Sequence, residues 1–112
     1  MWPMIGVDLV YIPEFQTRLE AGGTALLEKM FTLDELQNRN PGHLAGVWAA
    51  KEAVRKTLPE APNAWTDIYL VYEASGKPSA RYKDVPYDVS ISHQGDYAIA
   101  VAQELPRQEA TS

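Results

Sequence analysis

The chain has 112 residues, 46% of them hydrophobic and 22% charged, which is the composition of one globular domain and excludes wholesale disorder. It contains no cysteine, and this excludes disulfide scaffolds, thiolate zinc sites and cysteine nucleophiles. The formal charge of −5 argues against a general nucleic-acid binder.

The sequence carries no pattern typical of targeting or membrane insertion. The apolar residues 1–10 are interrupted by Asp8 and have no basic leader, so they do not resemble a signal peptide. No run of about 18 apolar residues is present, so we expect no membrane span and no membrane partner. We expect a single cytoplasmic domain over residues 1–104, followed by a flexible tail over residues 105–112.

The first predicted elements are a strand and a short helix. Residues 4–10 are apolar except at Asp8 and predict a strand. Pro13 suits the first turn of a helix, where its missing N–H does no harm, and this helix is expected to run to about residue 20. Gly22 and Gly23 then predict a break.

Two further helices are expected before the strands of the second half. Thr32 and Glu35 have the spacing of a capping box, in which each side chain accepts the backbone N–H of the other residue, so they predict a second short helix that ends near Asn38. The longest helical pattern covers residues 43–58 and is stopped by Pro59. Its many alanines keep the helix slim, so we expect another backbone to approach it closely.

The second half of the chain predicts strands. Four are expected, over residues 67–74, 78–82, 87–92 and 97–102. The last two strands are separated by a short polar turn, which predicts a hairpin. Helices early in the chain and antiparallel strands late in it predict an α+β fold, with three helices, one of them long, packed on an antiparallel sheet.

Asp8 is the first candidate functional residue. A carboxylate inside an otherwise apolar strand is costly unless it is paired or binds a cation. Asp8 therefore suggests a metal or catalytic site. The alternative is that it marks the end of the strand and caps the following helix.

Glu52 is the second candidate, in the middle of the long helix. Lys51 and Glu52 are most simply solvated, and Lys56 could form an i,i+4 ion pair with Glu52. However, Glu52 shares a helix face with small alanines, which suggests a close neighbour instead of open water. If Asp8 and Glu52 meet, they form a sparse oxygen site that suits Mg²⁺, because Mg²⁺ keeps waters and takes further ligands from substrate phosphates.

Two turn motifs could contact an anionic ligand. Ser92-His93 ends a strand, where His93 is either a structural turn residue or a donor to a phosphate oxygen. Adjacent residues of a strand face opposite ways, so this pair does not suggest a serine nucleophile. Gly76-Lys77-Pro78 has the composition of an ordinary turn, and it could also place an ammonium group near an anion.

Several short motifs follow one another along nearly the whole chain. They are Ile5-Gly6-Val7-Asp8-Leu9, Phe31-Thr32-Leu33-Asp34-Glu35-Leu36, Trp48-Ala49-Ala50-Lys51-Glu52-Ala53-Val54-Arg55-Lys56, Gly76-Lys77-Pro78, and Ser90-Ile91-Ser92-His93 followed by Tyr97-Ala98-Ile99-Ala100. In this order they resemble the holo-acyl-carrier-protein synthase family of small 4′-phosphopantetheinyl transferases. The resemblance implies the fold of that family and Mg-dependent transfer of the phosphopantetheine arm of coenzyme A to a serine of apo acyl-carrier protein. Adenosine 3′,5′-bisphosphate is released.

The resemblance also assigns roles to individual residues. It implies that Asp8 and Glu52 bind Mg²⁺ and that they act with Lys56 as the catalytic residues. It places against coenzyme A a set of residues from three parts of the chain, namely Lys56, Lys77, Pro78, Ser92 and His93. Small members of the family are homotrimers with sites between subunits, which agrees with a chain too small to enclose coenzyme A alone.

The chain departs from the family pattern at two places. Glu14 stands where the family often has a basic residue that helps to dock the acidic carrier, and Arg18 is the nearest basic residue on that helix. The family's Gly-Thr-Gly after the long helix is replaced by residues 58–62, which include two prolines and so offer fewer backbone N–H groups to phosphates. These departures motivate an alternative, a catalytically degenerate module that binds coenzyme A or a carrier protein.

Overall fold

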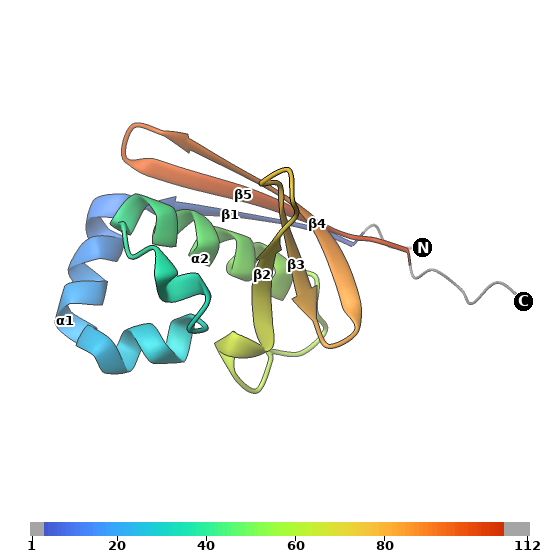
Figure 1. Ribbon diagram of the computed structural model, residues 1–112, viewed down its shortest axis with the longest axis horizontal. Coiled ribbons are helices and arrows are strands. Elements are labelled where there is room, and N and C mark those ends of the chain that lie inside the picture. The colour runs from blue at the N-terminus through green and yellow to red at the C-terminus, as the bar shows by residue number, and fades with distance from the viewer. Residues whose placement is uncertain (1–3, 107–112) are drawn as a thin grey trace, which may run out of the picture.

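One antiparallel sheet carries two α-helices on one of its faces in the computed structural model, which describes residues 4–106 (Figure 1). Its five strands lie in the order β1-β5-β4-β3-β2. The strands are β1 (Ile5–Tyr11), β2 (Ile68–Tyr72), β3 (Pro78–Tyr82), β4 (Val85–Gln94) and β5 (Tyr97–Glu104). The predicted α+β class and antiparallel sheet are therefore confirmed. Of the predicted tail, residues 107–112 lie outside the described part of the chain.

The first helix is longer than the sequence predicted. Helix α1 (Ile12–Met30) continues past the expected break with a kink at Gly23, whose φ of +63° is open to glycine at little cost. The helix resumes because its second half also has an apolar side, on which Leu26 and Leu27 pack against the core and Met30 is buried.

The prediction of a second short helix is wrong, so residues 4–106 form two α-helices and not three. The capping box of Thr32 and Glu35 does form, with N···O distances of 2.8 and 3.2 Å, but it closes only the 3₁₀ turn η1 (Glu35–Gln37). Asn40 precedes Pro41 and is therefore held in an extended conformation, which stops any continuation. So short a segment cannot sustain α-helical hydrogen bonding by itself.

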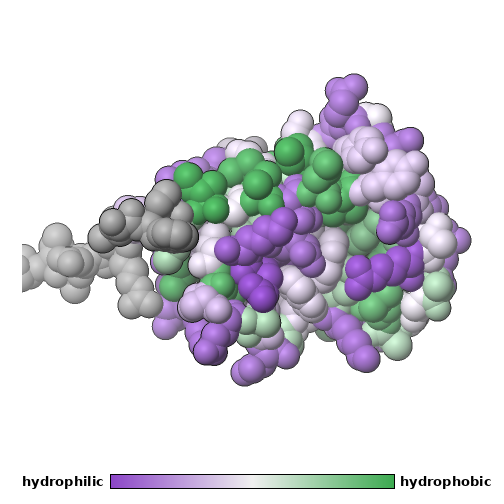
Figure 2. Space-filling model, turned by 180° about the vertical axis from the view of Figure 1, so that it is seen from behind, coloured by the Kyte–Doolittle hydropathy of each residue, from purple (hydrophilic) through white to green (hydrophobic). Residues whose placement is uncertain are grey.

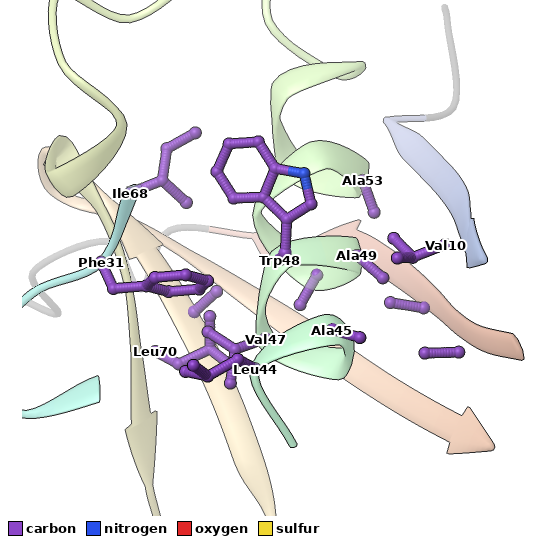
Figure 3. Close-up of a cluster of buried hydrophobic side chains, with 14 of the residues drawn as sticks. Val10, Phe31, Leu44, Ala45, Val47, Trp48, Ala49, Ala53, Ile68 and Leu70 are labelled. Carbon is purple, nitrogen blue, oxygen red and sulfur yellow. The ribbon is translucent and has the colours of Figure 1, made fainter. Parts of the chain in front are cut away.

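Helix α2 (Pro41–Arg55) is the centre of the fold. Asn40 caps it by accepting the N–H groups of Gly42 and His43, and Pro41 occupies its first turn. On one side its alanines face β1 and β5, and on the other Trp48 meets Phe31, Ile68 and the short turn η2 (Trp65–Asp67) (Figure 3).

The approach of α2 to β1 is unusually close. A Cβ atom at Gly6 would lie 1.8 Å from the carbonyl oxygen of Ala53, so no other residue fits there without moving the helix. This contact confirms the expected close neighbour of the alanine face. It also brings the middle of β1 next to the C-terminal turns of α2.

The opposite face of β1 and β5 is apolar and uncovered. Alternate residues of these strands point away from the helices, as the two-residue period of a strand requires. We call this surface the β1–β5 face, and its residues are Ile5, Val7, Leu9, Tyr11, Tyr97, Ile99 and Val101. Hydrophobic side chains gather over this part of the molecule in the view from behind (Figure 2). Within residues 4–106, neither helix has the length and apolar character to cross a bilayer.

Candidate active site

A cleft of about 380 Å³ opens between β1, the first turns of α1, and α2. We call it the Asp8 cleft. Its floor and walls combine carboxylates with aromatic and aliphatic side chains, and the lining residues are Asp8, Leu9, Val10, Tyr11, Glu14, Phe15, Arg18, Trp48 and Glu52. The cleft therefore brings together Asp8 and Glu52, the two acidic candidates of the sequence, from a strand and a helix that are far apart along the chain.

Asp8 is held in place by Lys56. The Lys56 ammonium donates to the Asp8 Oδ1 at 3.0 Å and to the backbone carbonyl of Val7 at 2.9 Å. The Asp8 side chain is 15% exposed, whereas that of Lys56 is 52% exposed. Lys56 thus bridges the end of α2 to β1, with Asp8 and not with Glu52 as its ion-pair partner.

Glu52 lies in an environment that disfavours its ionised form. Burial raises the pKa of Glu52, and the nearby Asp8 carboxylate raises it further. The positive charges of Lys56, Arg18 and Arg55 act in the opposite direction and are outweighed. Two carboxylates in one cleft repel each other, so a bound cation would relieve the repulsion.

The donor set fits a hard divalent cation that brings some of its own ligands. Asp8 and Glu52 offer carboxylate oxygens, which Mg²⁺ prefers, and Mg²⁺ is commonly held by one or two carboxylates with water and phosphate oxygens. Between residues 4 and 106, no three histidine, cysteine, aspartate or glutamate side chains are arranged to enclose a metal ion. The two carboxylates of the Asp8 cleft therefore suit an open Mg²⁺ site, in which water and the phosphate oxygens of a substrate supply the other ligands.

The other predicted ligand-binding residues lie elsewhere on the chain. Lys77 and Pro78 sit at the turn that begins β3, three strands away from β1, and Lys77 is paired with Asp88. The His93 imidazole lies 2.9 Å from the carbonyl oxygen of Gly42 at the start of α2, and Ser92 is exposed beside Ile99. None of these four residues lines the Asp8 cleft.

One charged cluster was not expected from the sequence. Lys51 is completely buried and pairs with Glu35 at 2.6 Å, so it is not the solvated lysine that its position suggested. Burial lowers the pKa of Lys51, while the Glu35 carboxylate opposes this effect. In the structure Lys51 ends an unbroken buried run of α2 that begins at Leu44.

Comparisons with known proteins identify the relatives of this chain. The model of the 4′-phosphopantetheinyl transferase superfamily matches residues 4–102. A holo-[acyl-carrier-protein] synthase of Syntrophotalea carbinolica is 40% identical over 115 aligned positions, covering 86% of this chain and 90% of the relative. A Chronobacterium ammoniagenes ACPS-CoA complex is 28% identical with a TM-score of 0.77, covering 96% of this chain and all of that one.

The fold comparison extends to more distant structures. A Helicobacter pylori holo-[acyl-carrier-protein] synthase in complex with coenzyme A has a TM-score of 0.81 at 24% identity, covering 90% of this chain and 99% of that one, so it shows the shared fold. The alternative of a degenerate binding module is not supported, because the relatives are synthases and both acidic residues meet in the cleft. The chain is therefore a transferase enzyme and belongs to the 4′-phosphopantetheinyl transferase superfamily.

Proposed function

We propose that this chain is a Mg-dependent holo-acyl-carrier-protein synthase that moves 4′-phosphopantetheine from coenzyme A to a serine of apo acyl-carrier protein. The observation that carries the proposal is the convergence of Asp8 and Glu52 in one cleft, with Lys56 on Asp8. Relatives named as synthases, and similar structures that contain coenzyme A, support the choice of substrates.

Two roles are proposed for the charged residues in and beside the cleft. Asp8 and Glu52 would hold Mg²⁺, and the ion would neutralise charge on the diphosphate of coenzyme A as its bond breaks. Lys56 keeps the Asp8 carboxylate turned into the cleft, and its exposed ammonium is available to a phosphate oxygen. Phe15 and Trp48 give the cleft apolar walls beside these charged groups.

The reaction balances without a further reactant. The serine oxygen forms a bond to the β-phosphorus, the bond from that phosphorus to the bridging oxygen breaks, and adenosine 3′,5′-bisphosphate leaves. The serine proton must be accepted during this step, and a carboxylate or a water molecule in the Asp8 cleft would take it.

The active protein is proposed to be a homotrimer with its sites between subunits. The residues expected to bind coenzyme A include four that do not line the Asp8 cleft of their own chain, namely Lys77, Pro78, Ser92 and His93, so a neighbouring chain would supply them. The uncovered β1–β5 face offers a surface for that neighbour, since Leu9 is 59% exposed and Ile5 is 54% exposed. Exposed apolar patches of this kind mark interfaces between proteins.

Transfer can be tested directly by mass spectrometry. Apo acyl-carrier protein incubated with this chain, coenzyme A and Mg²⁺ should gain roughly 340 Da, the mass of the transferred arm. Asp8→Ala and Glu52→Ala should retain the fold and lose more than about 100-fold in rate, as should the wild type after chelation of the metal. Undiminished transfer by either variant would reject the proposed role of the cleft.

A further inference from the structure

The buried ion pair of Lys51 and Glu35 connects α2 to α1, η1, η2 and β2. The Lys51 ammonium lies 2.6 Å from Glu35, 2.8 Å from the carbonyl oxygen of Met30 at the end of α1, and 3.4 Å from that of Trp65 in η2. The Glu35 carboxylate also accepts the backbone N–H of Thr32 at 2.8 Å and that of Leu70 in β2 at 2.9 Å.

Every polar atom of this cluster has a partner. Lys51 has three donor hydrogens and three acceptors, and Glu35 uses both of its oxygens. The two side chains are 0% and 2% exposed, so water does not loosen the arrangement. Among the described residues, no buried side-chain nitrogen or oxygen atom lacks a hydrogen-bond partner. The geometry of the cluster is therefore tightly specified.

Stability alone does not explain such a pair. Removing two charges from water costs free energy that their attraction only partly returns, so well-packed apolar residues often serve stability equally well. The best-attested use of a buried polar contact is to fix one register between elements. Here the contacts would fix the rotation of α2 about its own axis.

The residue that depends on this rotation is Glu52. It directly follows Lys51, so its side chain leaves the helix on the adjoining face, towards the Asp8 cleft. On the other side of Glu52, the carbonyl group of Ala53 lies against Gly6 of β1. Glu52 thus lies between two fixed contacts of α2. The contact of Ala53 with Gly6 sets the distance of α2 from β1, and the ion pair of Lys51 with Glu35 sets the rotation of the helix.

We propose that Lys51 and Glu35 are positioning residues, whose buried ion pair holds the Glu52 carboxylate opposite Asp8 in the geometry that binds the divalent ion. The inference rests on the proposed function, because it concerns the cation held in that cleft. Outer contacts that orient a metal ligand typically contribute a factor of about 10–100 in metal affinity. We expect an effect of that size here.

The test measures Mn²⁺ binding in the absence of carrier protein, so that no turnover occurs. The double variant Lys51→Met/Glu35→Gln removes both charges without leaving one unpaired, and circular dichroism and a cooperative thermal transition establish its folding. Electron paramagnetic resonance of free Mn²⁺, with coenzyme A present, should show a dissociation constant raised at least about tenfold. In a separate transfer assay with carrier protein, the KM of the double variant for the carrier should stay within about twofold of the wild-type value, since α1 and β1 keep their surfaces.

A matched control separates positioning from general loosening. Val47→Ala opens a cavity on the same face of α2 and keeps both partners of the ion pair, and it should leave Mn²⁺ binding within about twofold. Unchanged Mn²⁺ affinity in the double variant, or an equal loss in Val47→Ala, overturns the proposal. If the double variant does not fold, Lys51→Met alone carries the test with the same control, because Glu35 keeps its two backbone N–H donors and can take up a proton. Failure of the wild type to bind Mn²⁺ would instead reject the proposed function itself.

Discussion

At the scale of single residues, Glu52 combines a functional role with a cost in stability. Its pKa is raised in the folded protein, first by burial and then by Asp8, so the folded protein favours its protonated form. At neutral pH the ionised Glu52 therefore destabilises the metal-free fold relative to a neutral residue of the same shape.

We accordingly expect Glu52→Gln to stabilise the metal-free protein at pH 7. The gain should stay below about 1 kcal/mol, because water screens the half-buried group. That corresponds to a melting temperature higher by a few degrees. As the pH falls through the raised pKa of Glu52, the wild type becomes protonated and the difference should vanish.

Thermal melting of both proteins in a chelator at several pH values checks this expectation. Glu60→Gln, which changes an exposed carboxylate in the loop after α2, is the control and should leave the melting temperature unchanged at each pH. A Glu52→Gln protein that is less stable than the wild type at pH 7 would show that the ionised carboxylate is favourably paired, contrary to the argument.

Glu14 is the residue whose charge should decide which carrier is accepted. It lines the Asp8 cleft from the first turn of α1, with Arg18 one turn further on, so a carrier whose serine enters the cleft must pass both. We expect Glu14→Lys to lower the KM for an acidic carrier by roughly two- to tenfold at low salt.

The kinetics should be measured over a range of salt concentrations, since the gain from Glu14→Lys should shrink as salt screens the charges. Glu20→Lys makes the same change of charge two residues after Arg18, outside the cleft lining, and should have a smaller effect. Equal effects of the two variants would indicate that net charge, and not the cleft mouth, governs carrier docking.

At the scale of elements, the contact between Gly6 and Ala53 fixes the spacing of β1 and α2. A methyl group at Gly6 would lie 1.8 Å from the Ala53 carbonyl oxygen, and because that atom belongs to backbone, the whole helix must move. We expect Gly6→Ala to destabilise the fold by at least about 2 kcal/mol. Transfer should also be slower in the folded fraction, because Glu52 moves away from Asp8.

Urea unfolding and the rate of transfer under folding conditions measure the two effects. Gly42→Ala provides the comparison, since a methyl group there meets only the Asn40 side chain, at 3.2 Å. It should cost little in stability and nothing in rate. The explanation fails if Gly6→Ala keeps the wild-type stability.

Sequence patterns predicted those elements whose cause is local. Apolar alternation located the strands, and the spacing of apolar residues located α2 within a few residues of its ends. The two errors have different causes. Helix α1 continues beyond Gly23 because its second half packs against the core, which is a non-local cause. The segment at Glu35 stays a short turn because it is too short to sustain α-helical hydrogen bonding and is followed by the extended Asn40 before Pro41.

The two acidic residues of the site were predictable because their signals are local. A carboxylate in an apolar strand and another on an alanine-rich helix face are visible in the sequence, and the structure brings Asp8 and Glu52 into one cleft. The pair of Lys51 and Glu35 was not predictable, because a capping box and a mid-helix lysine each have an ordinary local explanation. Only the tertiary fold makes them partners.

At the scale of the whole molecule, two features point to assembly. The β1–β5 face leaves Val7 50% exposed and Tyr11 44% exposed, although each lies in the middle or at the end of a regular strand. In addition, Lys77 and His93, which are expected to bind the nucleotide, do not line the Asp8 cleft of their own chain. A second chain bound to the β1–β5 face would cover its apolar side chains and could bring Lys77 and His93 to the cleft. A monomer would do neither.

Mixing of subunits tests this arrangement. Asp8→Asn disables the cleft, and His93→Ala disables the group that a neighbouring chain would contribute. If each site takes Asp8 from one chain and His93 from the next, random trimers refolded from equal amounts of the two variants contain about a quarter of intact sites. The mixture should then regain about a quarter of the wild-type transfer rate, well above either variant alone, and light scattering should give three times the mass of one chain. A mixture no more active than the average of its components would place both residues in the same chain, since intact sites could then never form.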